Sequence, residues 1–222
     1  ITGLGSFYES HNKKFFKKLF SFLFSLSLSR ANKIIFYNQG NMKQFIKDRI
    51  CLEINSVIVP GSGVDINYYL GKPKEYNNEK IIFLCSARLL KDKGICEYLE
   101  AAREIKKTYE NVEFNLIGWH QDSDGNVSQT YIDTFVKDGI VNFYGYSEDV
   151  RTFLINCDVF VLPSYHEGMP RSALEAMSMS KALLLSDIPG TQELIRNGEN
   201  GYYFESKSKH SLIQAIKLIL KE

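Results

Sequence analysis

Short apolar runs alternate with amphipathic stretches along most of the chain. Runs such as Ile81-Ile82-Phe83-Leu84 and Val159-Phe160-Val161-Leu162 are apolar on both faces, which is typical of strands buried beneath helices in a parallel sheet. This alternation predicts an α/β fold with a Rossmann-like, doubly wound parallel sheet. The expected strands are 33–37, 56–59, 80–86, 112–117, 140–144, 158–163, 182–186 and 201–204. The expected helices are 40–49, 94–108, 128–138, 148–157, 170–180, 190–196 and 207–220.

Residues 13–28 combine a basic start with a strongly apolar remainder. The uncharged run from Leu19 to Ser29 is too short to cross a bilayer, which takes about 20 residues. Two interpretations stay open. Residues 13–28 form either an amphipathic helix that makes peripheral contact with an anionic membrane, or a helix packed into the core of a domain. In the first interpretation the headgroups are bound by Lys13, Lys14, Lys17 and Lys18.

A polar segment at residues 67–80 has no hydrophobic period and contains Gly71 and Pro73, as linkers do. We interpret residues 1–66, with two strand–helix units, as the tail of an N-terminal domain. Residues 81–222 hold enough strands for one complete sheet. Because the chain starts at Ile1 with a glycine-containing segment, we expect it to start inside a longer protein. We also expect it to lack a final C-terminal segment.

The amino-acid composition argues against two classes of function, nucleic-acid binding through a basic surface and zinc binding through cysteines. The formal net charge of the 222 residues is +1, which argues against binding nucleic acid through a large basic field. The four cysteines are far apart and show no zinc-ligand spacing. We interpret them as reduced thiols, which favours a cytoplasmic location. They are Cys51, Cys85, Cys96 and Cys157.

Two basic residues follow the strand expected at 80–86, in the segment SARLLKDKG. Ligands of open α/β sheets bind beyond the carboxyl ends of the strands, where Arg88 and Lys93 are expected. Arginine presents a planar pair of donors to phosphate oxygens, and lysine adds a compact charge. A solvated basic turn would give the same pattern, so this segment alone leaves both interpretations open.

A second unusual segment, PSYHEGMPRSALE, follows the strand expected at 158–163. Pro170 suits the first position of a helix, and the amides of Arg171 and Ser172 would then form a phosphate site at the helix N-terminus. Glu167 and Glu175 could each accept hydrogen bonds from neighbouring hydroxyl groups of a sugar. Each glutamate alone could be a surface residue, but both beside a basic loop favour a ligand site.

Two further segments carry weaker signals. Asp187-Ile188-Pro189-Gly190 follows the strand expected at 182–186 and is a common kind of turn. Asp122-Ser123-Asp124 has the spacing of a metal-binding motif. Since Val127 occupies the position at which a calcium loop needs glycine, we interpret Asp122–Asp124 as a polar turn and expect no metal site.

Taken together, these motifs resemble the large retaining glycosyltransferase group 4. HEGMPRSALEAM is similar to its paired-glutamate signature, and SARLLKDKG to its diphosphate-binding loop. VIVPGSGVDINYY resembles its interdomain segment, and DIPGTQELI and NGENGYYF follow in the expected order. The resemblance covers nearly the whole chain. The segments TGLG and IGWHQDSDGN most resemble bacterial members that extend lipid-linked surface glycans.

The resemblance implies the GT-B fold, in which two Rossmann-like domains enclose the active site; this chain would hold the C-terminal, donor-binding domain and a remnant of the N-terminal, acceptor-binding one. Arg88, Lys93 and Glu167 become the predicted catalytic residues: the cations neutralise the donor diphosphate, and Glu167 holds the transferred sugar. Glu175 would hold the ribose hydroxyls. The other predicted donor-binding residues are Tyr146, near the base, and Gly168, Met169, Pro170, Arg171 and Ser172, around the phosphates.

The implied reaction moves a hexose or N-acetylhexosamine, with retention, from a nucleotide-diphosphate sugar to a glycan or polyprenyl-linked acceptor, as in capsule and lipopolysaccharide biosynthesis. UDP is the favoured nucleotide, and neither a cofactor nor a metal is expected. A location at the inner face of the cytoplasmic membrane would suit this acceptor. We expect the chain by itself to be inactive. Two alternatives stay open: a nucleotide-sugar 2-epimerase and a non-catalytic nucleotide-sugar-binding module of the same fold. One departure is Trp119-His120 after Gly118, where relatives commonly have a second glycine.

Overall fold

The computed structural model describes residues 14–71, 80–120 and 125–221, with side chains from Lys17 onward. The opening segment, Lys13, most of the expected linker and Asp122–Asp124 therefore lie outside the described residues. The chain divides into two compact units. Unit 1 comprises residues 1–63 and the segments His166–Arg171 and Ile188–Glu193, and unit 2 comprises the remainder.

In its described residues, unit 1 contains a small parallel sheet and the helices α2 and α3. Strands β1 (Ile34–Phe36) and β2 (Ser56–Ile58) pair in parallel, and helices α2 (Lys14–Leu28) and α3 (Gln39–Lys47) accompany them. Helix α3 begins at an N-cap, Asn38, whose side chain accepts a hydrogen bond from the Asn41 amide at 2.8 Å. The unit has its own core of Ile34, Phe36, Phe45 and Ile50, with Phe20, Phe24 and Leu28 of α2 packed against it.

Helix α2 is therefore partly a core helix, as one of the two interpretations expected. Its other side is exposed, since Leu19, Phe22, Leu23 and Leu26 are 43%, 60%, 52% and 57% accessible to solvent. Among the described residues, α2 and every other helix falls short of the length and apolar character needed to traverse a bilayer.

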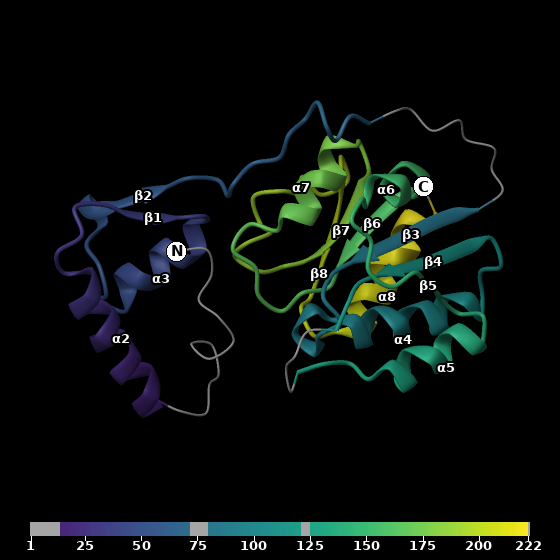
Figure 1. Cartoon of the computed structure of the whole chain (residues 1–222), viewed down its shortest axis with the longest axis horizontal. Coiled ribbons are helices and arrows are strands. Elements are labelled where there is room, and N and C mark those ends of the chain that lie inside the picture. The colour runs from purple at the N-terminus through teal and green to yellow at the C-terminus, as the bar shows by residue number, and fades with distance from the viewer. Residues whose placement is uncertain (1–13, 72–79, 121–124, 222) are drawn as a thin grey trace. The chain divides into compact units, whose positions relative to one another are not determined.

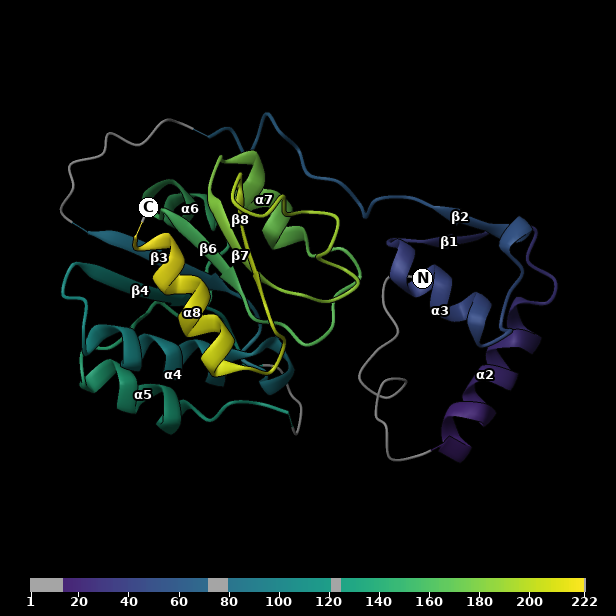
Figure 2. The same ribbon diagram turned by 180° about the vertical axis from the view of Figure 1, so that it is seen from behind.

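Unit 2 is built on one parallel sheet with the strand order β5-β4-β3-β6-β7-β8 (Figures 1 and 2). The strands are β3 (Ile81–Ser86), β4 (Val112–Ile117), β5 (Asn142–Phe143), β6 (Val159–Leu162), β7 (Ala182–Ser186) and β8 (Gly201–Phe204). All five neighbouring pairs are parallel. Numbered from the first strand, this is the order 3-2-1-4-5-6 of doubly wound nucleotide-binding sheets, so the predicted fold class is confirmed.

Helices cover both faces of this sheet, as Figures 1 and 2 show: α4, α5 and α8 on one face, α6 and α7 on the other. They are α4 (Ile95–Lys106), α5 (Gln129–Lys137), α6 (Arg151–Asn156), α7 (Arg171–Ser178) and α8 (Lys209–Ile219). The central strands are buried on both faces; every residue of β6 is buried. Side chains of the strands and of α4, α5 and α8 form one large core that includes the stacked rings of Phe83 and Phe114.

The predicted elements agree with the structure to within a few residues, with one exception. Residues 190–196 form turns instead of a helix. The Thr191 hydroxyl donates to the Ile188 carbonyl at 2.9 Å and accepts from the Ile188 amide at 3.3 Å. This local side-chain bonding competes with helix formation. Two short 3₁₀ helices, Glu53–Asn55 and Lys91–Lys93, were not predicted.

All four cysteines are free thiols, as predicted. Cys85 and Cys157 are buried, whereas Cys51 and Cys96 are half-buried. Burial raises the pKa of the Cys85 thiol to about 12, so this thiol stays protonated and behaves as a small apolar core residue.

Candidate functional site

The strand order places a topological switch point between β3 and β6. From β3 the chain proceeds to β4 and β5 on one side, whereas β6 is followed by β7 and β8 on the other. Ligands of doubly wound sheets bind at such a point, beyond the carboxyl ends of the two strands. The two segments that leave β3 and β6 here are the basic loop, residues 86–94, and the acidic loop, residues 163–170. The sequence singled out both.

The basic loop is held in shape by its backbone. Leu89 is fully buried, its amide donates to the Trp119 carbonyl at 3.0 Å, and its carbonyl accepts from the Val127 amide at 2.8 Å. A 3₁₀ helix then leads to Gly94, whose left-handed φ of 69° turns the chain into α4. Arg88 and Lys93 are half-buried on this anchored loop, so the backbone that carries both cations is held at the switch-point edge of the sheet.

The basic loop is joined directly to the start of the acidic loop. The Tyr165 amide donates to the Asp92 carbonyl at 2.8 Å, and the Tyr165 hydroxyl donates to Oε1 of Glu97 at 2.6 Å. A Cβ on Gly94 would lie 2.1 Å from the Pro163 carbonyl oxygen, so only glycine permits this approach. Burial, and then the hydrogen bond to Glu97, raise the pKa of Tyr165. The start of the acidic loop, as far as Tyr165, is therefore held against the basic loop.

Replacing Tyr165 by phenylalanine is expected to lower the free energy of unfolding by about 1–3 kcal/mol, because a hydrogen bond to a charged group is lost. Urea denaturation measures the change. A matched control is Tyr109→Phe, since the Tyr109 ring packs against the same core but its hydroxyl has no hydrogen bond within the described residues. Equal stability losses in the two variants would show that the Tyr165–Glu97 bond does not hold the loops together.

The acidic loop leads into α7, which begins at Arg171 directly after the buried Pro170. Arg171 is exposed and Ser172 half-buried, and Glu175 in the second turn is buried at 8% exposure. A carboxylate so little exposed needs polar partners or a polar ligand.

Three predicted residues, Glu167, Gly168 and Met169, are half-buried on the segment that enters this helix. A third loop packs on the segment, since a Cβ on Gly190 would lie 2.3 Å from the Glu167 carbonyl oxygen. The weak Pro-Gly signal in the sequence therefore marks a close contact between the backbones of two loops.

The loops that follow β4 and β5 lie at the same edge of the sheet, beyond the carboxyl ends of these strands. The Gly118 amide donates to the Gly145 carbonyl at 2.9 Å, and a Cβ on Gly118 would lie 2.1 Å from the Ala87 carbonyl oxygen. Trp119 and Tyr146 are 46% and 63% exposed, and their rings meet edge to face with centroids 5.5 Å apart. This aromatic pair was not predicted. The sequence did indicate something unusual here, because Trp119 follows Gly118 at a position where the family commonly has a second glycine.

Among the described residues, no group of three or more histidine, cysteine or carboxylate side chains is arranged to hold a metal ion.

The structure brings Arg88, Lys93 and Tyr146, with α7 and its Glu175, to one edge of the unit 2 sheet. Glu167 lies on the loop that connects β6 to α7, and the continuity of the chain alone relates it to this edge. Such an edge is suited to an elongated, negatively charged ligand with a planar ring.

Comparisons with known proteins identify the family of the chain. The family described as glycosyl transferases group 1 matches residues 71–222. The N,N'-diacetylbacillosaminyl-diphospho-undecaprenol alpha-1,3-N-acetylgalactosaminyltransferase of Campylobacter jejuni is 32% identical over 100% of this chain and 60% of its own length. The UDP-Gal:alpha-D-GlcNAc-diphosphoundecaprenol alpha-1,3-galactosyltransferase of Escherichia coli is 25% identical over 96% of this chain and 57% of its own length. The chain thus spans less than two thirds of these relatives.

Solved structures share the fold. The crystal structure of HepE from Anabaena in complex with UDP and glucose superposes with a TM-score of 0.73 at 20% identity, over 91% of this chain and 58% of that one. The six-stranded parallel sheet flanked by helices matches GT-B glycosyltransferase structures. Because the family match covers more than half of the chain, the chain belongs to the group 1 glycosyl transferases.

Proposed function

We propose that this chain forms the donor side of a retaining glycosyltransferase that moves a hexose or N-acetylhexosamine from a nucleotide-diphosphate sugar, with UDP favoured, to a glycan or lipid-linked acceptor. The observation that carries the proposal is the contact between the basic loop and the start of the acidic loop at the switch point. The Tyr165 amide bonds to the Asp92 carbonyl, and Gly94 packs closely against the Pro163 carbonyl. This contact supports an arrangement in which Arg88 and Lys93 act together with the N-terminus of α7 on one ligand. Pyrophosphate recognition needs these groups.

The chemistry expected of these residues is mainly electrostatic. Cleavage of the bond between sugar and phosphate leaves negative charge on the nucleotide diphosphate. Arg88, Lys93 and the first amides of α7 would stabilise that charge as it develops, because they are fixed before the reaction begins. Glu175 would accept hydrogen bonds from the ribose hydroxyls and Glu167 from hydroxyls of the transferred sugar. No metal is required in this mechanism.

The aromatic pair extends the proposed site toward the base. Tyr146 was predicted to lie near it, and Trp119 lies against Tyr146. Exposed aromatic rings offer planar apolar surface on which a nucleobase can stack. We therefore assign Trp119 and Tyr146 to the nucleobase side of the donor site.

The acceptor side is proposed from the relatives and from unit 1. Two relatives carry names with diphosphoundecaprenol acceptors, and an acceptor of that kind is anchored in a membrane. Peripheral contact of residues 13–28 with the inner face of the cytoplasmic membrane would bring this chain to such a substrate. The exposed apolar side of α2 supports this contact.

A panel of nucleotide sugars tests the donor assignment. A ligand present at 100 times its dissociation constant stabilises a protein by about 2.7 kcal/mol, which differential scanning fluorimetry detects as a higher melting temperature. We expect UDP-hexoses and UDP-N-acetylhexosamines to raise it, and AMP, which lacks a diphosphate, to leave it unchanged. A panel in which no nucleoside diphosphate or nucleotide sugar stabilises the folded chain would contradict the proposal.

A further inference from the structure

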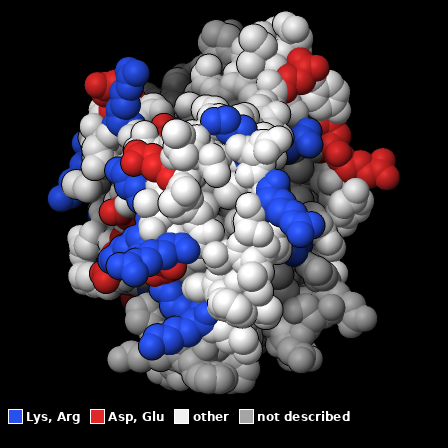
Figure 3. Space-filling view, turned by 90° about the vertical axis from the view of Figure 1, so that its left-hand side faces the viewer, with Lys and Arg blue, Asp and Glu red and all other residues white. Residues whose placement is uncertain are grey.

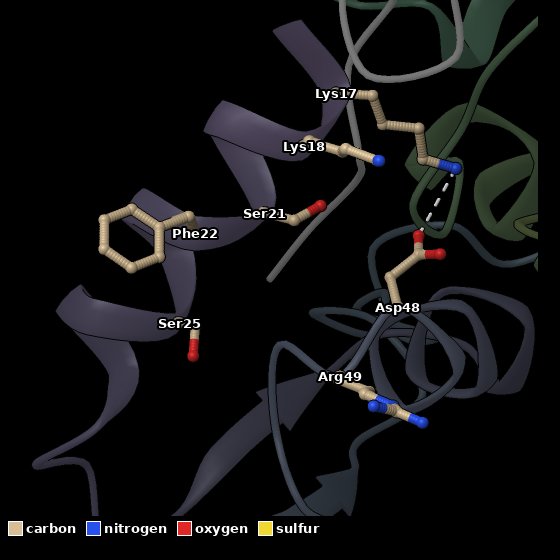
Figure 4. Close-up of a pocket in the computed structure, with 7 residues that line it drawn as sticks. All are labelled: Lys17, Lys18, Ser21, Phe22, Ser25, Asp48 and Arg49. Carbon is tan, nitrogen blue, oxygen red and sulfur yellow. Dashed lines mark ion pairs between the residues drawn. The ribbon is translucent and has the colours of Figure 1, made fainter. Parts of the chain in front are cut away.

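Unit 1 carries an open pocket of about 480 Å³ that the donor site does not use. It lies between the first turns of α2 and the end of α3 and is lined by Lys17, Lys18, Ser21, Phe22, Ser25, Asp48 and Arg49. Figure 4 shows that Lys17 and Lys18 reach from α2 toward Asp48, whereas the Phe22 ring points to the other side of the helix. Three basic residues and one carboxylate thus line the described part of the pocket.

The charge balance of this pocket favours an anion. Lys17 is paired with Asp48, at 3.3 Å between Nζ and Oδ2. Lys18 and Arg49 are both exposed, and Asp48 is the one carboxylate among the described residues that line the pocket. Two serine side chains on α2, Ser21 and Ser25, supply hydroxyl donors. Two cations beyond the paired one, together with hydroxyl groups, form a set of donors suited to a phosphate group.

The position of the lysines on α2 is unfavourable for the helix itself. The first turn of α2 contains no acidic residue, and Lys17 and Lys18 lie close to its positive N-terminal end. Cations near this end oppose the helix dipole. A bound anion would offset this unfavourable interaction. The charges are therefore better explained by a ligand than by helix stability.

An exposed apolar stripe runs beside the pocket. Lys18, Ser21 and Ser25 are three and four residues apart and share one side of α2, and Phe22 and Leu26 begin the neighbouring side. That side continues through Leu19 and Leu23, all four being at least 43% exposed. Figure 3 draws the side of the molecule on which α2 lies; blue basic side chains there border broad uncharged areas.

We propose that this pocket binds the phosphate of an anionic phospholipid while the stripe of Leu19, Phe22, Leu23 and Leu26 rests among the acyl chains. Cations beside exposed apolar side chains match a membrane surface, which offers phosphate and hydrocarbon side by side. A soluble phosphate would use the pocket but leave the stripe exposed. The inference rests on the membrane-contact part of the proposed function and adds to it a defined headgroup site.

Flotation of the full chain with lipid vesicles tests this site without any nucleotide. We expect binding to vesicles that contain phosphatidylglycerol and little binding to pure phosphatidylcholine. Since each basic residue near an anionic surface contributes about 1 kcal/mol, Lys18→Ala with Arg49→Ala should weaken binding to the anionic vesicles about 30-fold. The matched control is Lys43→Ala with Lys47→Ala, which removes two exposed lysines of α3 that do not line the pocket. A similar loss in the control would overturn the headgroup site.

A second variant should strengthen binding and so cannot act through misfolding. Asp48→Asn keeps the side-chain shape but removes the carboxylate that Asp48 contributes to the pocket lining. We expect about 5-fold tighter binding to phosphatidylglycerol vesicles. Unchanged or weaker binding would overturn the inference. Equal binding to both kinds of vesicle would also overturn it, as would a dimer of the chain in sedimentation that Phe22→Ser abolishes, because a second copy would then cover the stripe.

Calorimetric titration of UDP into the unmodified chain separates this inference from the proposed function. Absent vesicle binding with intact UDP binding contradicts the lipid site alone. Absent UDP binding with intact vesicle binding contradicts the donor assignment alone.

Discussion

Replacing Arg88 or Lys93 by alanine is expected to weaken UDP binding about 10- to 100-fold, because each variant loses a charge-assisted hydrogen bond to a phosphate oxygen. Both side chains are half-buried on a loop whose backbone is anchored by Leu89 and Gly94. Truncation should therefore remove the cation without disturbing the loop. Isothermal titration calorimetry measures the dissociation constants, and urea denaturation confirms that the variants are folded.

Lys91 provides the matched control for these variants. It lies on the same loop, between Arg88 and Lys93, but is exposed to solvent. Lys91→Ala has the same change in net charge, so a field effect of the whole loop would appear in all three variants. We expect Lys91→Ala to change UDP binding by no more than about 2-fold, as for a screened surface charge. Equal losses in all three variants would contradict a specific pyrophosphate site.

Replacing Gly94 by alanine is expected to destabilise unit 2 by more than about 3 kcal/mol. An alanine there must adopt the left-handed φ of 69°, which costs about 1–2 kcal/mol. Its Cβ would also lie 2.1 Å from the Pro163 carbonyl oxygen, a backbone atom that cannot turn away. The basic and acidic loops must then separate, so UDP binding should be lost together with stability. Urea denaturation and calorimetry measure the two effects.

Gly139→Ala separates the two contributions. Gly139 has nearly the same φ, 67°, but a Cβ there would have no atom within 4 Å. This variant should show only the conformational cost, about 1–2 kcal/mol, with UDP binding intact. If Gly94→Ala is no less stable than Gly139→Ala, the close packing of the two loops is not important for the fold.

Much of the fold could be predicted because its signals are local. The strands at 112–117, 182–186 and 201–204 were predicted with the boundaries observed, since apolar runs between turn residues leave little choice of structure. The prediction of a helix at residues 190–196 was wrong because the hydrogen bonds between Thr191 and Ile188 compete with a helix. These bonds are made by the Thr191 hydroxyl, and the hydrophobic pattern of the sequence does not reveal them.

The strand order could not be read from the sequence, because it depends on pairing between distant segments. It is nevertheless the strand order that places β3 beside β6 and so joins the basic and acidic loops. Tyr165 shows the same limit: its bonds to Asp92 and Glu97 span more than 60 residues. The pair of Trp119 and Tyr146 likewise unites two loops. The residue types at the candidate site were predictable, and their mutual support was not.

The convergence of these loops on one nucleotide diphosphate is tested most directly by backbone amide chemical shifts of the labelled chain during titration with UDP. The donor site predicts shifts concentrated in residues 86–94, 118–120, 145–148 and 164–175. Residues 108–112, at the opposite edge of the sheet, should remain unperturbed. Shifts centred on that opposite edge, or none at millimolar UDP, would contradict the assignment.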